Sequence, residues 1–162
     1  MTSLRSHVYV GRRDNAVTSQ QNYGILLKIL DLTRNKFKNL DFLSEFRNLT
    51  SLILDRNKLD SDTILPHLPN LLLLWLNYSK VDELFPFIRN LQRSFPNLRF
   101  LSMLGNPAAP SYLNGGTEYE HLQYSLFVIS WFRHLIHMYD RYVTIHERNE
   151  ANRLFCRPFW NV

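Results

Sequence analysis

Three histidines and an aspartate near the end of this 162-residue chain are the residue types that could ligate a metal: His134, His137, Asp140 and His146. Imidazole and carboxylate groups hold zinc only where several of them converge on one point. His134 and His137 would share a face within one helix, but we expect them to flank a short strand, from which they would point in different directions. The sequence therefore predicts no metal site.

The remaining reactive groups make no stronger case for catalysis. Cys156 is the single cysteine and has no obvious base beside it. The sequence contains no glycine-rich phosphate-binding loop, and no pair of carboxylates falls where a fold would bring the two together. We therefore expect a protein that is not an enzyme and needs no cofactor.

The elements that position these residues are marked by a repeated spacing of leucines. In the stretch LTSLILDRNKL, residues 49–59, the leucine spacing suits neither a strand nor an amphipathic helix. The same offsets recur in stretches that begin at Leu27, Leu71 and Leu98. This is the L-x-x-L-x-L-x-x-N-x-L signature of leucine-rich repeats. Its polar position is occupied by Asn35, Asn57, Ser79 and Asn106, so the units are 22, 22 and 27 residues apart.

This signature predicts an α/β fold, a leucine-rich-repeat solenoid. We expect a short right-handed horseshoe with parallel strands on the concave face and a helical C-terminal cap. The leucines of each strand should point into the core. The side chains of Asn35, Asn57 and Asn106 should bond to the backbone where the chain turns away from each strand. Ser79 replaces asparagine in the third unit and should cap its turn less well.

The same pattern divides the chain into four segments. We expect an N-terminal cap or flexible segment at 1–24, where HVYV is the only strand-like piece, and leucine-rich repeats at 25–117. Residues 118–155 should form the cap, because the last repeat would otherwise leave an apolar face in water. Residues 156–162 are a short tail.

Three helices are expected. The longer third unit predicts one around residues 84–91 on the convex side. In the cap, Thr144 stands three residues before Glu147, which predicts a helix start. An apolar helical stripe should pack inside the cap rather than form a ligand pocket or membrane helix. The stripe consists of Tyr124, Phe127, Val128, Trp131 and Phe132.

Composition and charge suggest an intracellular domain. The start of the chain lacks the apolar core of a signal peptide, and one cysteine cannot form an internal disulfide. The net charge of +5 raises the question of nucleic-acid binding, but no nucleic-acid-binding motif is present. The tightest basic cluster, Arg34, Lys36 and Lys38, is either a solvated turn or a phosphate-binding patch.

The repeat also identifies a candidate binding surface. Side chains between the leucines of each strand should face the concave side. There, an apolar and aromatic group flanked by charges has the composition of a protein interface. The predicted partner-binding residues are Leu73, Trp75, Tyr78 and Phe100, with Arg34, Arg56 and Asp55 beside them. The alternative is that the N-terminal segment or the loop 109–117 folds over these residues and buries them.

Two resemblances go beyond the repeat itself. The stretch YSLFVISWFRHLIHMYDRYVTIHERNEA resembles the cap of short intracellular leucine-rich-repeat proteins, including the spliceosomal U2 A-prime protein and the acidic nuclear phosphoproteins. Over about residues 39–155 the chain more closely resembles the family of leucine-rich melanocyte differentiation-associated proteins. The stretches that carry this resemblance are ILDRNKL at 53–59, LPHLP at 65–69, LSMLGN at 101–106 and VTIHERNEA at 143–151.

The chain departs from the family pattern at two places. Family caps usually end their last strand with Leu-Asp, whereas this chain has Met138 and Tyr139, with Asp140 one place later. The tail after the cap is also shorter than in family members.

The second resemblance implies an adaptor in intracellular membrane traffic and melanosome or lysosome-related organelle biogenesis. It implies a cytoplasmic protein recruited to endosomal or melanosomal membranes, where it links a GTP-bound Rab GTPase to the Retriever recycling complex. It implies protein partners, no small-molecule substrate and no transmembrane segment. The alternative, implied by the first resemblance, is a nuclear ribonucleoprotein assembly subunit like the U2 A-prime protein.

Overall fold

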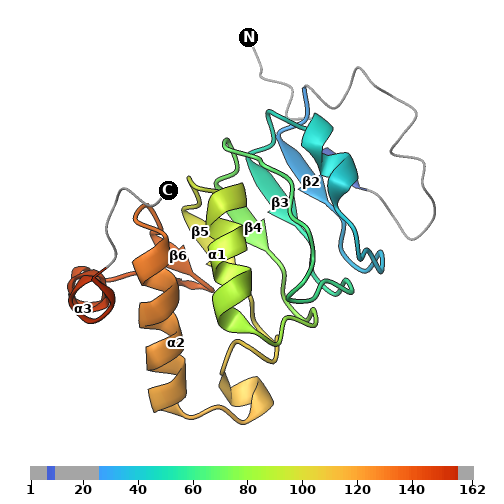
Figure 1. Ribbon diagram of the computed structural model, residues 1–162. Coiled ribbons are helices and arrows are strands. Elements are labelled where there is room, and N and C mark those ends of the chain that lie inside the picture. Colours follow the sequence, from blue (N-terminus) through green and yellow to red (C-terminus); the bar gives the residue numbers. More distant parts are fainter. Residues whose placement is uncertain (1–6, 10–25, 157–162) are drawn as a thin grey trace.

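Seven short strands form one sheet in the computed structural model, which describes residues 7–9 and 26–156 (Figure 1). Neighbouring strands are parallel from β1 to β6, whereas β7 runs antiparallel to β6. The predicted leucine-rich-repeat architecture is thereby confirmed. The strands are β1 (His7–Tyr9), β2 (Ile29–Asp31), β3 (Ser51–Ile53), β4 (Leu73–Trp75), β5 (Phe100–Ser102), β6 (His137–Met138) and β7 (Arg141–Tyr142).

The strand register stacks the leucines into columns. One column pairs the central residues of β2 to β5 and continues to β6, and none of its members is more than 2% exposed. Each buried leucine contributes about 2 kcal/mol of hydrophobic free energy. Stacking of the repeats therefore supplies stability that a single repeat, which cannot bury its own apolar face, would lack. The column consists of Leu30, Leu52, Leu74, Leu101 and Met138.

The connections on the convex side differ from repeat to repeat. A 3-10 helix, η2 (Asp41–Glu45), lies between β2 and β3. The described chain between β3 and β4 has no helix, and it contains Pro66 and Pro69, which disfavour helical backbone. The 27-residue unit holds α1 (Leu84–Ser94), which confirms the helix expected around 84–91. Its buried side chains include Phe87, Ile88 and Leu91.

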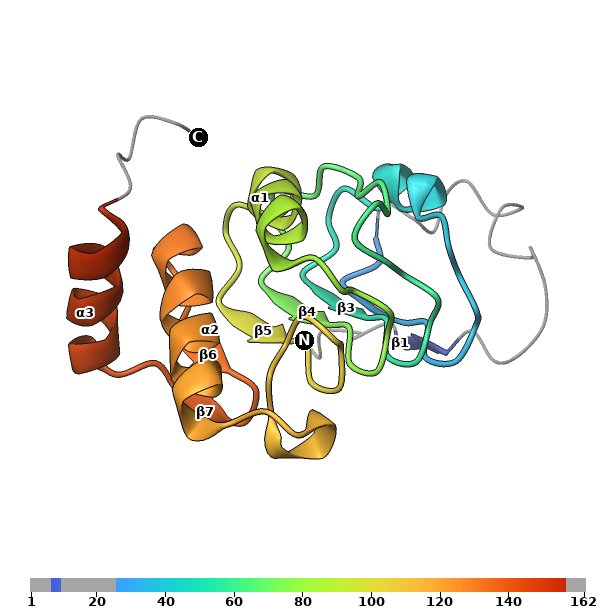
Figure 2. The ribbon, with the colours of Figure 1, turned by 60° about the horizontal axis from the view of Figure 1, so that its bottom comes forward.

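Two helices close the C-terminal end of the solenoid: α2 (Glu118–Trp131) and α3 (Ile145–Phe155). Helix α2 lies between α1 and α3 and contacts both (Figure 2). None of the helices in the described residues is long and apolar enough to cross a membrane. Because α2 has a neighbour on each side, its buried residues are not the predicted stripe alone. Helix α2 also buries Ser125, Leu126 and Ile129. Of the stripe, Tyr124 and Val128 are buried in α2 and Phe132 just after it, whereas Phe127 and Trp131 are only half-buried.

Both cap helices begin with a reciprocal capping box. Thr144 accepts a hydrogen bond from the Glu147 N–H and donates to its carboxylate, so the predicted helix start is confirmed. Thr117 and Glu120 form the same arrangement at the start of α2. The sequence carried that signal too, as a threonine three residues before a glutamate.

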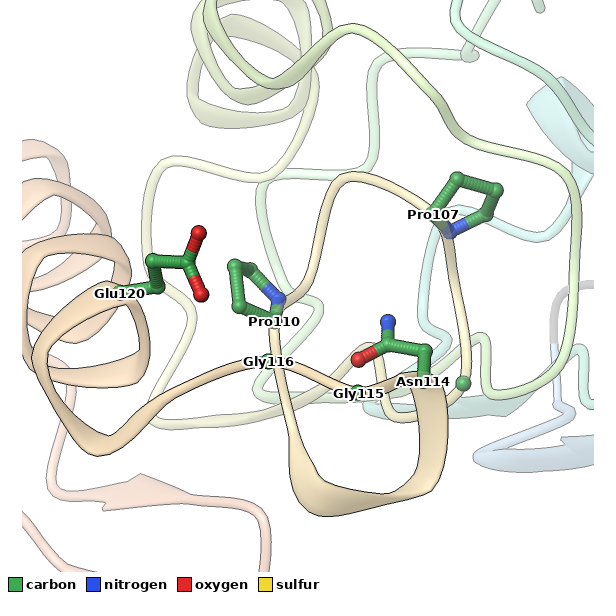
Figure 3. Close-up of a pocket in the computed structure, with 7 residues that line it drawn as sticks. Pro107, Pro110, Asn114, Gly115, Gly116 and Glu120 are labelled. Carbon is green, nitrogen blue, oxygen red and sulfur yellow. The ribbon is translucent and has the colours of Figure 1, made fainter.

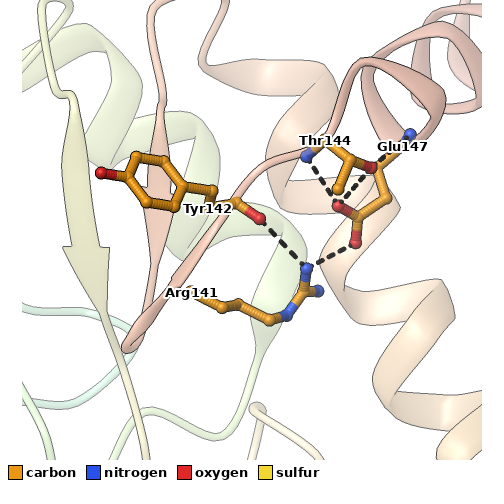
Figure 4. Close-up of polar contacts among 4 residues, drawn as sticks. All are labelled: Arg141, Tyr142, Thr144 and Glu147. Carbon is orange, nitrogen blue, oxygen red and sulfur yellow. Dashed lines mark hydrogen bonds and ion pairs between the residues drawn. The ribbon is translucent and has the colours of Figure 1, made fainter.

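The Glu147 carboxylate also binds the β6–β7 hairpin, since it forms an ion pair with Arg141 at 2.8 Å (Figure 4). Burial opposes ionisation of Glu147, but the hydrogen bonds from Thr144 and the pairing with Arg141 outweigh it. They hold the pKa of the Glu147 carboxyl below its usual value. The start of α3 is thus linked to the last strand of the sheet.

Arg148 joins α3 to the end of α2. Its guanidinium donates to the carbonyl oxygens of Ile129 at 2.6 Å, Phe132 at 3.0 Å and Leu135 at 2.6 Å. The last carbonyls of a helix have no partner within the helix, and they carry partial negative charge. A cation from α3 therefore caps α2.

The cap departs from the family pattern without disturbing the register. Met138 takes the position of a core leucine, opposite Leu101. Tyr139 adopts a left-handed backbone with φ of 58° and stacks on His121 and Tyr124. Burial raises the pKa of Tyr139 to about 12, so its hydroxyl stays neutral at physiological pH.

Candidate protein-binding site

The concave surface of the sheet carries the strand residues that the sequence singled out. Leu73 of β4 pairs with Phe100 of β5, and Trp75 lies between Ile53 and Ser102. Leu73 and Phe100 are half-buried and Trp75 is 40% exposed, while the intervening Leu74 is fully buried. This alternation is what a strand with one face on the core requires.

Tyr78 reaches the same surface from the turn that follows β4. It is 43% exposed, and the Arg56 guanidinium lies 4.6 Å from the centroid of its ring, within the range of a cation–π interaction. A Cβ on Gly105 of the next repeat would lie 2.4 Å from the Tyr78 ring. Only glycine therefore leaves room for this ring position. We call Leu73, Trp75, Tyr78 and Phe100 the aromatic patch.

The charged residues beside the aromatic patch differ in their availability. Arg34 and Arg56 are exposed. Asp55, which the sequence places with them, instead accepts hydrogen bonds from the backbone N–H and side-chain amide of Asn77. The Asn77 oxygen in turn accepts from the Ser102 hydroxyl at 2.6 Å. Asp55 thus helps to hold three repeats in register, a role that sequence reasoning did not find.

The cap extends the concave surface beyond the predicted residues. His137 lies within β6, not beside it as the sequence suggested, and its ring stacks on Phe100 at 5.2 Å. Tyr142 of β7 lies 4.0 Å from the His137 ring and is 72% exposed. The leucine spacing could have identified His137, because it precedes Met138 as Phe100 precedes Leu101.

The loop 109–117 does not bury the aromatic patch, because Trp75 and Tyr78 keep 40% and 43% of their surface exposed. The other covering segment considered, residues 1–24, lies outside the described residues except for β1. The loop 109–117 therefore leaves the aromatic patch open to solvent.

A surface pocket of about 490 Å³ lies in that loop (Figure 3). The side-chain amide of Asn114 is used within the loop, where it accepts from the Ser111 N–H and donates to the carbonyls of Asn106 and Ala109. The Glu120 carboxylate is used by the Thr117 capping box. These groups hold the loop in shape, and we assign the pocket no ligand. Its lining residues are Gly105, Pro107, Pro110, Asn114, Gly115, Gly116 and Glu120.

The repeat asparagines link neighbouring turns. Asn57 donates to the carbonyls of Leu32 and Leu54, both at 2.9 Å, and accepts from the Phe37 N–H. Two units further on, Asn106 makes the same three contacts: it donates to the carbonyls of Leu76 and Met103 and accepts from the Val81 N–H. The half-buried Asn35 donates to the Thr33 carbonyl.

The third unit differs from this arrangement. The Ser79 hydroxyl is buried without a hydrogen-bond partner among the described residues. The third unit therefore lacks the contacts that Asn57 and Asn106 provide.

The residues considered for metal binding do not gather. Among residues 7–9 and 26–156, no three His, Cys, Asp or Glu side chains are placed to hold a metal ion. His134 accepts from the Arg133 guanidinium, His137 stacks between aromatic rings, and Cys156 is exposed.

Comparison with known proteins places these features in context. No family model matches the chain. The chain is 38% identical over 129 residues to the human leucine-rich melanocyte differentiation-associated protein, a match that covers 76% of this chain. It spans 65% of that relative's length.

Among solved structures, a chain of the Drosophila melanogaster SNF/U2A′ complex matches with a TM-score of 0.47 and 22% identity, over 78% of this chain and 80% of that one. The resemblance that the residues between the leucines suggested is confirmed by the human relative. The chain is a leucine-rich-repeat protein similar to the human leucine-rich melanocyte differentiation-associated protein.

Proposed function

We propose that the chain is a non-catalytic adaptor whose concave face binds a protein partner. The observation that carries the proposal is the aromatic patch, in which Trp75 and Tyr78 are exposed and Arg56 lies over the Tyr78 ring. Tryptophan, tyrosine and arginine are the residues enriched at the energetic centres of protein interfaces.

The process in which the adaptor acts is proposed from its relative. The name of the human protein connects it with melanocyte differentiation. We propose that this chain works in intracellular membrane traffic and melanosome or lysosome-related organelle biogenesis. It would be cytoplasmic, recruited to endosomal or melanosomal membranes, and would link a GTP-bound Rab GTPase to the Retriever recycling complex.

The test is calorimetric titration of GTP-loaded and GDP-loaded Rab proteins into the full chain and into the variant Trp75→Ala. Trp75 lies on a middle strand between Ile53 and Ser102, and its exposed ring should be an interface centre. We expect Trp75→Ala to cost at least about 2 kcal/mol of affinity and to change the melting temperature little.

The matched control is Tyr119→Ala, which removes an aromatic side chain of α2 that is 69% exposed. It should leave binding and melting unchanged. A Trp75→Ala variant that melted early and bound normally would show that Trp75 packs rather than binds, and the concave face would be the wrong surface.

A further inference from the structure

A row of exposed cations runs beside the aromatic patch. Two positions in the turn after each strand are basic in successive repeats. The first position is Arg34 and Arg56, and the second is Lys36, Lys58 and Lys80; all five side chains are exposed. We call these five residues the basic ladder. The sequence showed only its first unit, as part of the cluster Arg34, Lys36 and Lys38, because stacking of the repeats brings the others beside it.

The backbone of the basic ladder is fixed by hydrogen bonds between repeats. The N–H of Arg34 donates to the Asp55 carbonyl at 2.9 Å, and that of Arg56 to the Asn77 carbonyl at 2.8 Å. In the opposite direction, the N–H of Lys58 donates to the Phe37 carbonyl of the preceding repeat at 3.0 Å, and that of Lys80 to the Leu59 carbonyl at 2.8 Å. Successive units of the ladder are therefore held about 5 Å apart, the spacing of paired strands.

The cations of the basic ladder have no carboxylate partner among the described residues, where the ion pairs are Arg141–Glu147 and Arg153–Glu150. Acidic residues are near in sequence, but their hydrogen-bond donors are neutral groups, and they form no ion pair with the basic ladder. Asp31 accepts a hydrogen bond from Thr33, Asp55 from Asn77, Asp60 from Thr63 and Asp82 from Ser61. The charges of the ladder thus remain available to another molecule.

Several members of the ladder occupy strained backbone. Arg34, Lys36 and Arg56 have φ of 61°, 60° and 56°, in the left-handed region that costs a residue with a Cβ about 1 kcal/mol or more. The position of Arg34 and Arg56 is occupied in the third repeat by Tyr78, with φ of 53°, and in the fourth by Gly105, with φ of 72°. The left-handed backbone at this position therefore belongs to the turn of these four repeats, whichever side chain the position carries.

We propose that the basic ladder binds a short acidic segment of the protein that the concave face holds, an extended run of about three or four Asp or Glu residues. The inference rests on the proposed function, because the same protein partner would cover both the aromatic patch and the basic ladder. The Arg56–Tyr78 contact joins the ladder to the aromatic patch.

The borders of the ladder favour a narrow occupant over a membrane. Asp60 and Asp82 are exposed two residues after Lys58 and Lys80. A flat anionic surface would meet these carboxylates and be repelled, whereas an extended chain can follow the cations alone.

The test compares two triple variants of the full chain that lower the net charge equally. One is Lys36→Gln, Lys58→Gln and Lys80→Gln. The control is Arg89→Gln, Arg93→Gln and Arg99→Gln, which removes three exposed cations elsewhere. Binding of a fluorescent oligoglutamate peptide is measured by anisotropy, and binding of phosphatidylcholine–phosphatidylserine vesicles by sedimentation.

We expect the ladder variant to weaken peptide binding about tenfold and the control about twofold or less. Equal weakening in both variants, or no peptide binding to the unmodified chain, would overturn the proposal. Vesicle binding that depends on the ladder in the absence of peptide binding would identify a membrane as the occupant instead. Because Trp75→Ala leaves the ladder intact, it should retain peptide binding, so failure of the Rab titration and failure of the ladder are distinguishable.

Discussion

Single residues decide how firmly neighbouring repeats are joined. Asn57 uses both ends of its amide, donating to two repeats and accepting from the turn of the first. Ser79 stands at the same position of the third unit, but its shorter side chain leaves the hydroxyl without a partner in the described structure. The repeat interfaces are therefore unequal although their leucine columns are the same.

We predict that Asn57→Ala lowers the free energy of unfolding by about 1–3 kcal/mol, because a buried N–H and buried carbonyls lose their partner. Ser79→Ala should cost less, and Ser79→Asn should stabilise by up to about 1 kcal/mol if it forms the missing contacts. Urea unfolding of the three variants measures these differences. Equal losses for Asn57→Ala and Ser79→Ala would contradict the role given to the repeat asparagines.

At the scale of elements, the cap is held together by polar contacts that cross between helices. Arg148 of α3 donates to three carbonyls at the end of α2 and in the following turn. Glu147, its neighbour, pairs with Arg141 of β7. Adjacent residues of α3 thus contact opposite partners, α2 and the sheet, and fix where α3 lies.

We predict that Arg148→Ala destabilises the protein by about 2–4 kcal/mol, since three partly buried carbonyls lose a charged donor. Arg148→Lys should recover only part of this, because an ammonium group lacks the fork that reaches all three. The measurement is urea unfolding, with Arg153→Ala on the exposed side of α3 as the control. Equal effects of Arg148→Ala and Arg153→Ala would show that the contacts to α2 contribute little.

How much could be predicted at this scale depended on the range of the interaction. The strands, α1 and the Thr144 helix start follow from local spacing, and these predictions were correct. The Asp55–Asn77–Ser102 contacts and the Arg148 cap join residues far apart in sequence, so they depend on strand register and on the angle between two helices. Burial of α2 on two sides was missed because a single periodic stripe cannot show a second neighbour.

For the whole molecule, the cap is the structure that closes an otherwise open solenoid. Strand β6 pairs with β5, and α2 packs beside α1. Leu101 and Met103 of the last repeat are almost fully buried. A solenoid buries its apolar faces only against neighbouring units, so its last unit needs a cover.

We predict that removing residues 118–155 gives aggregated or molten protein, because the apolar end of the fourth repeat becomes exposed. Size-exclusion chromatography and a thermal melt followed by circular dichroism provide the measurement. A truncated chain that remained monomeric and melted cooperatively would show that the repeats are stable without the cap.

The candidate site, like the fold, could be predicted from the sequence only where it depends on local spacing. Leucine spacing placed Trp75, Leu73 and Phe100 on one face, because a strand alternates its side chains. It could not show that His137 and Tyr142 extend that face, or that cations from three repeats form one row. Both features depend on how neighbouring repeats stack, and the sequence shows only the spacing of the repeats along the chain.

The contact of Tyr78 with Gly105 also restricts how this chain can change over evolutionary time. A Cβ at position 105 would overlap the Tyr78 ring, which itself lies under the Arg56 guanidinium. Substitutions in three successive repeats are therefore not independent: a larger residue at 105 becomes acceptable only after the ring at 78 has been replaced by something smaller. Descendants of this sequence should then acquire such changes in a fixed order, and positions 56, 78 and 105 should vary together rather than singly.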